Sequence, residues 1–108
     1  MNINEHLFIK LMEECAEVQQ RVSKLLQFGP DEREPEQERT NVWRLRSELN
    51  DLIAIVVMLQ DRGLIPKTPG HDMAMHVTAK RQKIAKYLAY SQELGMVEVG
   101  DSSTKKEE

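Results

Sequence analysis

The chain has 108 residues, which suits one domain, and its 40% hydrophobic and 31% charged residues exclude a wholly disordered chain. Its formal net charge is −3, and its longest apolar run, residues 52–59, is far shorter than the roughly 20 residues that cross a membrane. We therefore expect neither nucleic acid nor a membrane as a partner. The single cysteine, Cys15, and a start without signal-peptide features predict a cytoplasmic protein.

Apolar residues recur at every third or fourth position through the first segment, which predicts a helix. We expect Asn4 to cap this helix, Glu5 to favour its positive end, and Gly29 with Pro30 to end it. The helix would have about 24 residues and a length of roughly 36 Å. Its apolar stripe consists of Leu7, Leu11, Val18, Val22 and Leu25.

A second helix is predicted after residues 29–40, which are polar, contain two prolines and indicate a loop. Thr40 or Asn41 caps this helix, which runs to about Arg62 and ends at Gly63. Its residues 52–59 are apolar all round, so they need covering on more than one side. Two other helices of this length do not cover them, and we expect copies of the chain to associate.

The third helical stretch runs from about Asp72 to Leu94 and ends at Gly95, and the pattern leaves open whether it is one helix or two. The end of the chain is polar and charged, so we predict a domain over residues 1–98 and a flexible polar tail over residues 99–108. The fold class we predict is all-α. We expect an antiparallel bundle of three to four helices, completed by homo-oligomerisation.

Each of the first two predicted helices carries an acidic pair at i, i+3: Glu14 with Glu17, and Glu48 with Asp51. This spacing places both carboxylates of a pair on one helix face, and antiparallel packing would bring the two pairs together. One close pair of like charges costs about 1 kcal/mol in water and ~4 kcal/mol at an effective dielectric constant of 20. Mg²⁺ or Mn²⁺ removes this repulsion and prefers oxygen ligands. The two pairs therefore predict a divalent metal site.

The first helix also allows a simpler interpretation. Lys10, Glu14, Glu17 and Arg21 follow a spacing that is typical of solvated, ion-paired helix faces. Both interpretations stay open for this helix. The second acidic pair shares its helix face with apolar residues, where an unpaired carboxylate is costly. These apolar residues are Leu45, Leu52, Ala54, Ile55 and Met58.

Glu13-Glu14-x-x-Glu17 followed by Glu48-x-x-Asp51 resembles the EExxE…ExxD signature of the MazG-like nucleotide pyrophosphohydrolases, in the all-α NTP pyrophosphatase superfamily. The resemblance implies Mg²⁺-dependent hydrolysis of a nucleoside or deoxynucleoside triphosphate to the monophosphate and pyrophosphate. It implies Glu14, Glu17, Glu48 and Asp51 as metal ligands and Glu13 as an accessory acid, which makes these five the catalytic residues. It also implies a homodimer or tetramer.

Cations must stabilise the charge on departing pyrophosphate, and basic residues of two helices are candidates. These are Lys80, Arg81 and Lys83 on the third helix, with Lys24 and Arg21 on the first. Trp43 is a candidate for stacking on the base, although a lone tryptophan is more often part of a core or interface. A basic helix face is also common without any ligand.

A function of another class is also compatible with these patterns. The chain could be a non-catalytic oligomeric adaptor or regulatory protein that uses its charged helix faces to bind a partner. This alternative does not explain why Glu48 and Asp51 share a face with apolar residues. A di-iron carboxylate protein is excluded by the lack of Glu-x-x-His pairs after Glu14 or Glu48. The sequence does not identify the base, the sugar or the number of metal ions.

Overall fold

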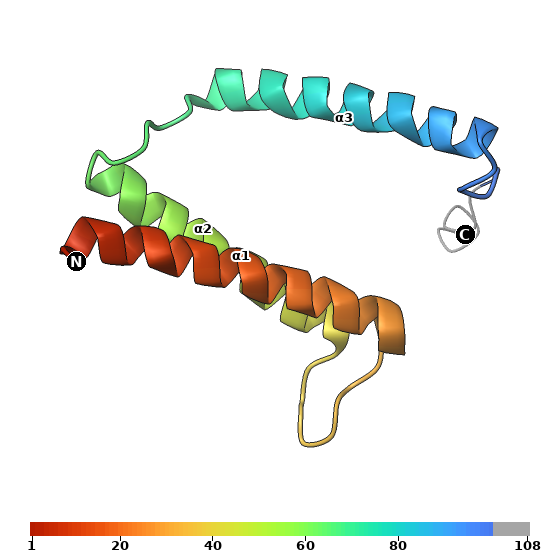
Figure 1. Cartoon of the computed structure of the whole chain (residues 1–108), viewed down its shortest axis with the longest axis horizontal. Helices are drawn as coiled ribbons and strands as arrows, with labels where there is room; N and C mark the ends of the chain where they lie inside the picture. The colour runs from red at the N-terminus through yellow and green to blue at the C-terminus, as the bar shows by residue number, and fades with distance from the viewer. Residues whose placement is uncertain (101–108) are drawn as a thin grey trace. The chain divides into compact units, whose positions relative to one another are not determined.

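The computed structural model describes residues 1–100, which contain three helices and no strand (Figure 1). The helices are α1 (Ile3–Phe28), α2 (Asn41–Asp61) and α3 (Gly70–Glu93). They confirm the predicted all-α class. The chain divides between Lys67 and Thr68 into two units, the first containing α1 and α2 and the second containing α3. Residues 101–108, most of the predicted polar tail, lie outside the described residues.

A capping box starts α1, and it places the start of the helix two residues earlier than predicted. The side-chain oxygen of Asn2 accepts a hydrogen bond from the backbone N–H of Glu5 at 2.8 Å. In return, Glu5 Oε1 accepts one from the backbone N–H of Asn2 at 3.0 Å. Two amides that the first turn leaves without partners are thus satisfied. The prediction that Asn4 caps the helix was wrong, because Asn4 lies inside it. The predicted end was right: Gly29 follows α1 with φ 95°, a conformation that favours glycine.

The loop between α1 and α2 provides what a capping side chain would otherwise supply. Thr40 is the residue before α2, as predicted, but its side chain forms no capping hydrogen bond. The backbone N–H of Asn41 donates instead to the backbone carbonyl of Glu32 at 3.0 Å. The Asn41 side chain, only 1% exposed, donates to the Gly29 carbonyl and to Glu32 Oε1, both at 2.9 Å. These bonds tie the loop to the first turn of α2.

The helices α1 and α2 form an antiparallel pair (Figure 1). At one end Arg62 Nε donates to the Asn4 side chain at 2.9 Å, and at the other Asn41 is bonded to Gly29. Leu7 and Leu59 are the buried apolar side chains of the described chain, at 7% and 0% exposed. Half-buried apolar residues continue the seam between the helices: Leu11, Val18 and Leu25 of α1, and Leu45, Leu52 and Ile55 of α2. This seam carries most of the predicted apolar stripe of α1.

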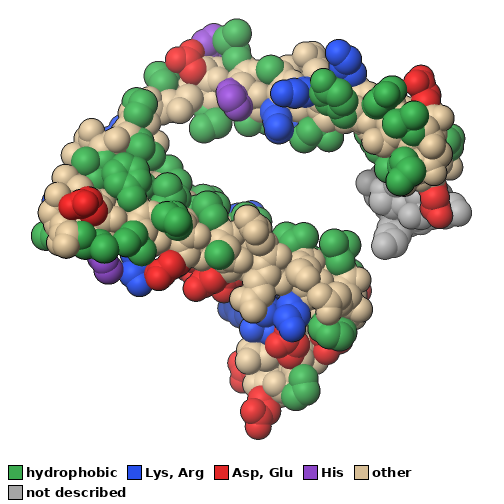
Figure 2. All heavy atoms as spheres, viewed as in Figure 1, with side chains coloured by type: hydrophobic (Ala, Val, Ile, Leu, Met, Phe, Trp, Pro, Cys, Tyr) green, Lys and Arg blue, Asp and Glu red, His purple; other side chains and the backbone are tan. Residues whose placement is uncertain are grey.

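Much of the apolar surface of both units is exposed (Figure 2). On α2, Ile53, Val57 and Met58 are 45–54% exposed, as expected for a helix that is apolar all round. The third helical stretch is one continuous helix, and none of its residues is buried. Packing rather than intrinsic propensity normally stabilises a helix in water. In residues 1–100, no helix is both long enough and apolar enough to span a membrane.

Candidate metal centre

Three glutamates from two helices meet in the seam of the first unit. Glu14 and Glu17 of α1 and Glu48 of α2 each place one carboxylate oxygen within 4.8 Å of an oxygen of the other two. The three-residue spacing puts the first two on one face of α1, and antiparallel pairing puts Glu48 opposite them. Glu14 and Glu48 are half-buried, whereas Glu17 is exposed. The cluster therefore has a closed side in the seam and an open side toward solvent.

Two buried oxygens of this cluster have no hydrogen-bond partner in the described part of the chain. Glu14 Oε2 and Glu48 Oε2 are both shielded from solvent and accept no hydrogen bond from residues 1–100. Within residues 1–100, none of the three clustered glutamates takes part in an ion pair. Burial of unpaired carboxylate oxygens is costly, and such a set of oxygens fits a hard divalent cation.

The ion pairs that the alternative for α1 would place among Lys10, Glu14, Glu17 and Arg21 are absent from residues 1–100. Lys10 Nζ lies 2.9 Å from Glu13 Oε1 rather than from Glu14. Arg21 pairs with Glu34 of the loop rather than with Glu17. Within the described chain, Glu14 and Glu17 therefore form no ion pair with Lys10 or Arg21, and they lie close to Glu48 of α2 instead.

The site raises the pKa of two of its carboxyls. Burial is the main cause for Glu14, followed by the negative charges of Glu17 and Asp51. Burial is also the main cause for Glu48, followed by its interaction with Glu17. Both carboxyls are harder to ionise than in the unfolded chain, because the charged form loses water and meets like charges. A bound cation would favour the charged form and so lower both pKa values.

These pKa shifts predict how stability depends on pH in EDTA. In the unfolded chain Glu14 and Glu48 titrate near their usual value of 4.5, and in the folded chain they titrate at higher pH. Between these values the folded chain binds more protons, so its stability rises as the pH falls. We expect the melting temperature to increase from about pH 7 to about pH 5, and to increase less in Glu48→Gln. An identical pH profile in the two proteins, followed by circular dichroism, would contradict this.

The five predicted catalytic residues differ in their positions. Asp51 is exposed and outside the group of three, although its charge helps to raise the pKa of both Glu14 and Glu48. Glu13 is exposed and held by Lys10. The structure therefore gathers three of the four predicted metal ligands and places the fourth within electrostatic reach.

An ion-pair network next to the cluster was only partly expected from sequence. Glu34 of the loop places Oε1 3.4 Å from Arg21 Nη1 and Oε2 3.0 Å from Arg44 Nη1. Arg21 was predicted to bind phosphate, whereas Glu34 and Arg44 were not among the predicted site residues. One signal was present in the sequence: Arg21 follows Glu17 by four residues, and Arg44 precedes Glu48 by four. That spacing places each arginine on the face of its glutamate.

The other predicted ligand-binding residues lie apart from the cluster or in the second unit. The Lys24 ammonium lies 5.6 Å from the centre of the Phe28 ring. The exposed Lys80, Arg81 and Lys83 belong to α3, in the second unit, and their role in phosphate binding stays a prediction.

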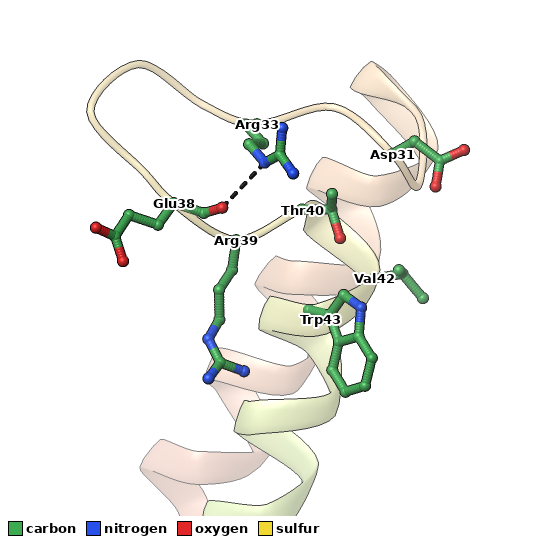
Figure 3. Close-up of a pocket in the computed structure, with 7 residues that line it drawn as sticks. All are labelled: Asp31, Arg33, Glu38, Arg39, Thr40, Val42 and Trp43. Carbon is green, nitrogen blue, oxygen red and sulfur yellow. Dashed lines mark hydrogen bonds between the residues drawn. The ribbon is translucent and has the colours of Figure 1, made fainter.

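Trp43 lines a pocket formed with the loop (Figure 3). The indole is 57% exposed and shares this pocket with Arg33, Arg39 and other loop residues. Trp43 precedes Glu48 by five residues, which puts the two about 140° apart around the axis of α2. The pocket is therefore on another face of α2 than the glutamate cluster, and base stacking by Trp43 stays a prediction.

Comparison with known proteins adds no relative: the chain matches no protein-family model, no curated protein and no solved structure. Its function is therefore inferred from the glutamate cluster and from the spacing of the acidic residues that build it.

Proposed function

We propose that the chain is a Mg²⁺-dependent pyrophosphohydrolase with a MazG-like all-α fold, which hydrolyses a nucleoside or deoxynucleoside triphosphate to the monophosphate and pyrophosphate. One observation carries the proposal. Two buried carboxylate oxygens, of Glu14 and Glu48, have no hydrogen-bond partner among the described residues, and Glu17 completes a group of oxygens within 4.8 Å. Buried acids without partners are expected where a cation is to be bound.

Glu14, Glu17 and Glu48 would bind Mg²⁺, with Mn²⁺ as a substitute, and Asp51 would be the fourth ligand. A divalent cation bound there would neutralise phosphate charge and lower the pKa of a water molecule. Glu13, next to Glu14, is the proposed accessory acid, because an exposed carboxylate in that position can orient a water molecule or accept its proton. Glu17 faces solvent, so substrate would enter from its side.

We further propose that the working form is a homodimer or tetramer. Ile53, Val57 and Met58 of α2 are about half exposed, and α3 has no buried residue. Association would cover these surfaces and complete the bundle of three to four helices. Lys80, Arg81 and Lys83 of α3 are then proposed to bind phosphate. A cytoplasmic location is proposed because the one cysteine, Cys15, is free and exposed.

The alternative of a non-catalytic adaptor is favoured by the same exposed apolar surface of α3. A protein-binding helix would present such a face to a partner. This alternative gives no reason for the partnerless oxygens of Glu14 and Glu48, which lower stability unless something binds them. The hydrolase is therefore the better-supported proposal.

The direct test is incubation of the full chain with the common ribo- and deoxyribonucleoside triphosphates in Mg²⁺, with the products separated by ion-exchange chromatography. We expect monophosphate and pyrophosphate from at least one nucleotide, and no product in EDTA. Release of diphosphate and phosphate would contradict the proposed reaction. No turnover of any nucleotide in Mg²⁺ or Mn²⁺ would contradict the proposed activity.

A further inference from the structure

Two arginines from different helices converge on one loop carboxylate beside the glutamate cluster. Glu34 lies 3.4 Å from Arg21 Nη1 and 3.0 Å from Arg44 Nη1. The Arg21 side chain is only 10% exposed, and those of Arg44 and Glu34 are 23% and 27% exposed. The structure thus holds two positive charges close together in the seam, with one carboxylate to neutralise them.

Glu34 does not accept hydrogen bonds from all the donor groups that the two arginines direct toward it. Its pKa is lowered chiefly by its interaction with Arg44, which favours the ionised carboxylate. Yet Arg44 Nη1 is shielded from solvent and donates no hydrogen bond within residues 1–100, although Glu34 Oε2 is 3.0 Å away. A phosphate group offers more oxygens than a carboxylate, and arginine binds phosphate through two parallel hydrogen bonds. The two guanidinium groups therefore suit a larger anion better than they suit Glu34.

The position of the arginines relates them to the glutamate cluster. Arg21 lies one helical turn beyond Glu17, and Arg44 lies one turn before Glu48. A turn rises about 5.4 Å, a span that a chain of two phosphates covers. The seam thus has an acidic segment followed by a basic one, in the order that a metal-bound polyphosphate requires.

The side chain of Glu34 can move away from the arginines without disrupting the loop. The hydrogen bonds of Asn41 to Gly29 and Glu32 hold the loop to α2 independently of Glu34. Within the described chain, the side chain of Glu34 has polar contacts with Arg21 and Arg44 alone. Rotation of this one side chain would therefore break both ion pairs and leave the two guanidinium groups free to pair with another anion.

We propose that Arg21 and Arg44 form an anion subsite for the pyrophosphate end of the substrate, and that Glu34 occupies this subsite until the anion displaces it. The inference rests on the proposed function for the identity of the anion. Glu34 then competes with the anion for the subsite. The larger the fraction of chains in which Glu34 occupies the subsite, the lower is the apparent affinity for pyrophosphate.

The test is calorimetric titration of the full chain with inorganic pyrophosphate in Mg²⁺, together with thermal melting. Glu34→Gln is expected to bind pyrophosphate about five- to tenfold more tightly, because the competing charge is removed. The same variant is expected to melt at a lower temperature, because its ion pairs are lost. A purely structural role for Glu34 predicts that affinity and melting temperature fall together. Weaker or unchanged pyrophosphate binding by Glu34→Gln would therefore overturn the inference.

The second variant, Arg44→Gln, is expected to bind pyrophosphate about tenfold more weakly than the natural chain. If it does not fold, Arg44→Lys keeps the charge but loses the planar fork, and weaker binding is again expected. Glu36→Gln and Arg46→Gln are the matched controls, since both residues are exposed and neither forms an ion pair in residues 1–100. Unchanged binding by the Arg44 variants would overturn the subsite.

This titration is read without turnover, so it separates the two proposals. If the chain is inactive but its variants show the expected order of pyrophosphate affinities, the subsite is supported and only the proposed hydrolysis is contradicted. If the chain is active but its pyrophosphate affinity is unchanged in the Glu34 and Arg44 variants, the proposed hydrolysis is supported and only the subsite is contradicted.

Discussion

Glu48→Gln is expected to lower the rate of Mg²⁺-dependent nucleotide hydrolysis by at least about a hundredfold, since even outer partners of metal ligands change activity 10–100-fold. Glutamine keeps the size of the side chain but removes the charge that would bind the cation. Glu48 is the member of the cluster contributed by α2, so no neighbouring glutamate of that helix replaces it within the group of three. The rate is measured from pyrophosphate release at saturating Mg²⁺.

The control for this variant is Asp61→Asn, which removes one exposed carboxylate from the same helix, away from the cluster. It is expected to retain full activity. Far-ultraviolet circular dichroism checks that both variants keep the helical content of the natural chain. Full activity in Glu48→Gln would mean that the cluster is not the metal site, whatever the reaction of the chain proves to be.

Mg²⁺ is expected to stabilise the folded chain strongly. A cation that binds only the folded state adds about 2.7 kcal/mol to the free energy of unfolding at a concentration of 100 times its Kd. In a chain of this size that corresponds to an increase of about 10–20 °C in melting temperature. The physical reason is the repulsion among Glu14, Glu17 and Glu48, which have no ion pair in the described chain to offset it.

Glu48→Gln makes this experiment more decisive, because the substitution is expected to change stability in opposite directions in the metal-free and in the Mg²⁺-bound chain. In EDTA the variant is expected to melt at a higher temperature than the natural chain, since one buried charge is gone. In Mg²⁺ it is expected to lose most of the stabilisation. Sodium chloride at matched ionic strength controls for general screening of charge. An adaptor without a metal site would respond equally to Mg²⁺ and to the matched salt.

The helices and the faces that carry the acids could be predicted from local sequence. Helical periodicity acts over three or four residues, so it identified α1, α2 and α3 and put Glu14 and Glu17 on one face. The start of α1 was misplaced because Asn2 and Asn4 are both good caps, and only Asn2 has a glutamate three residues later to complete the box.

Which charged groups meet depends on how the helices and the loop pack in three dimensions. Sequence spacing offered Lys10 and Arg21 as partners for the acids of α1, but Lys10 pairs with Glu13, and Arg21 pairs with Glu34. The reason is physical: an ion pair with a loop depends on how that loop folds back, and no periodicity governs a loop. Local sequence was thus sufficient for the helices and the acidic faces, whereas packing of α1 against α2 created the cluster and left two of its buried oxygens without a hydrogen bond in residues 1–100.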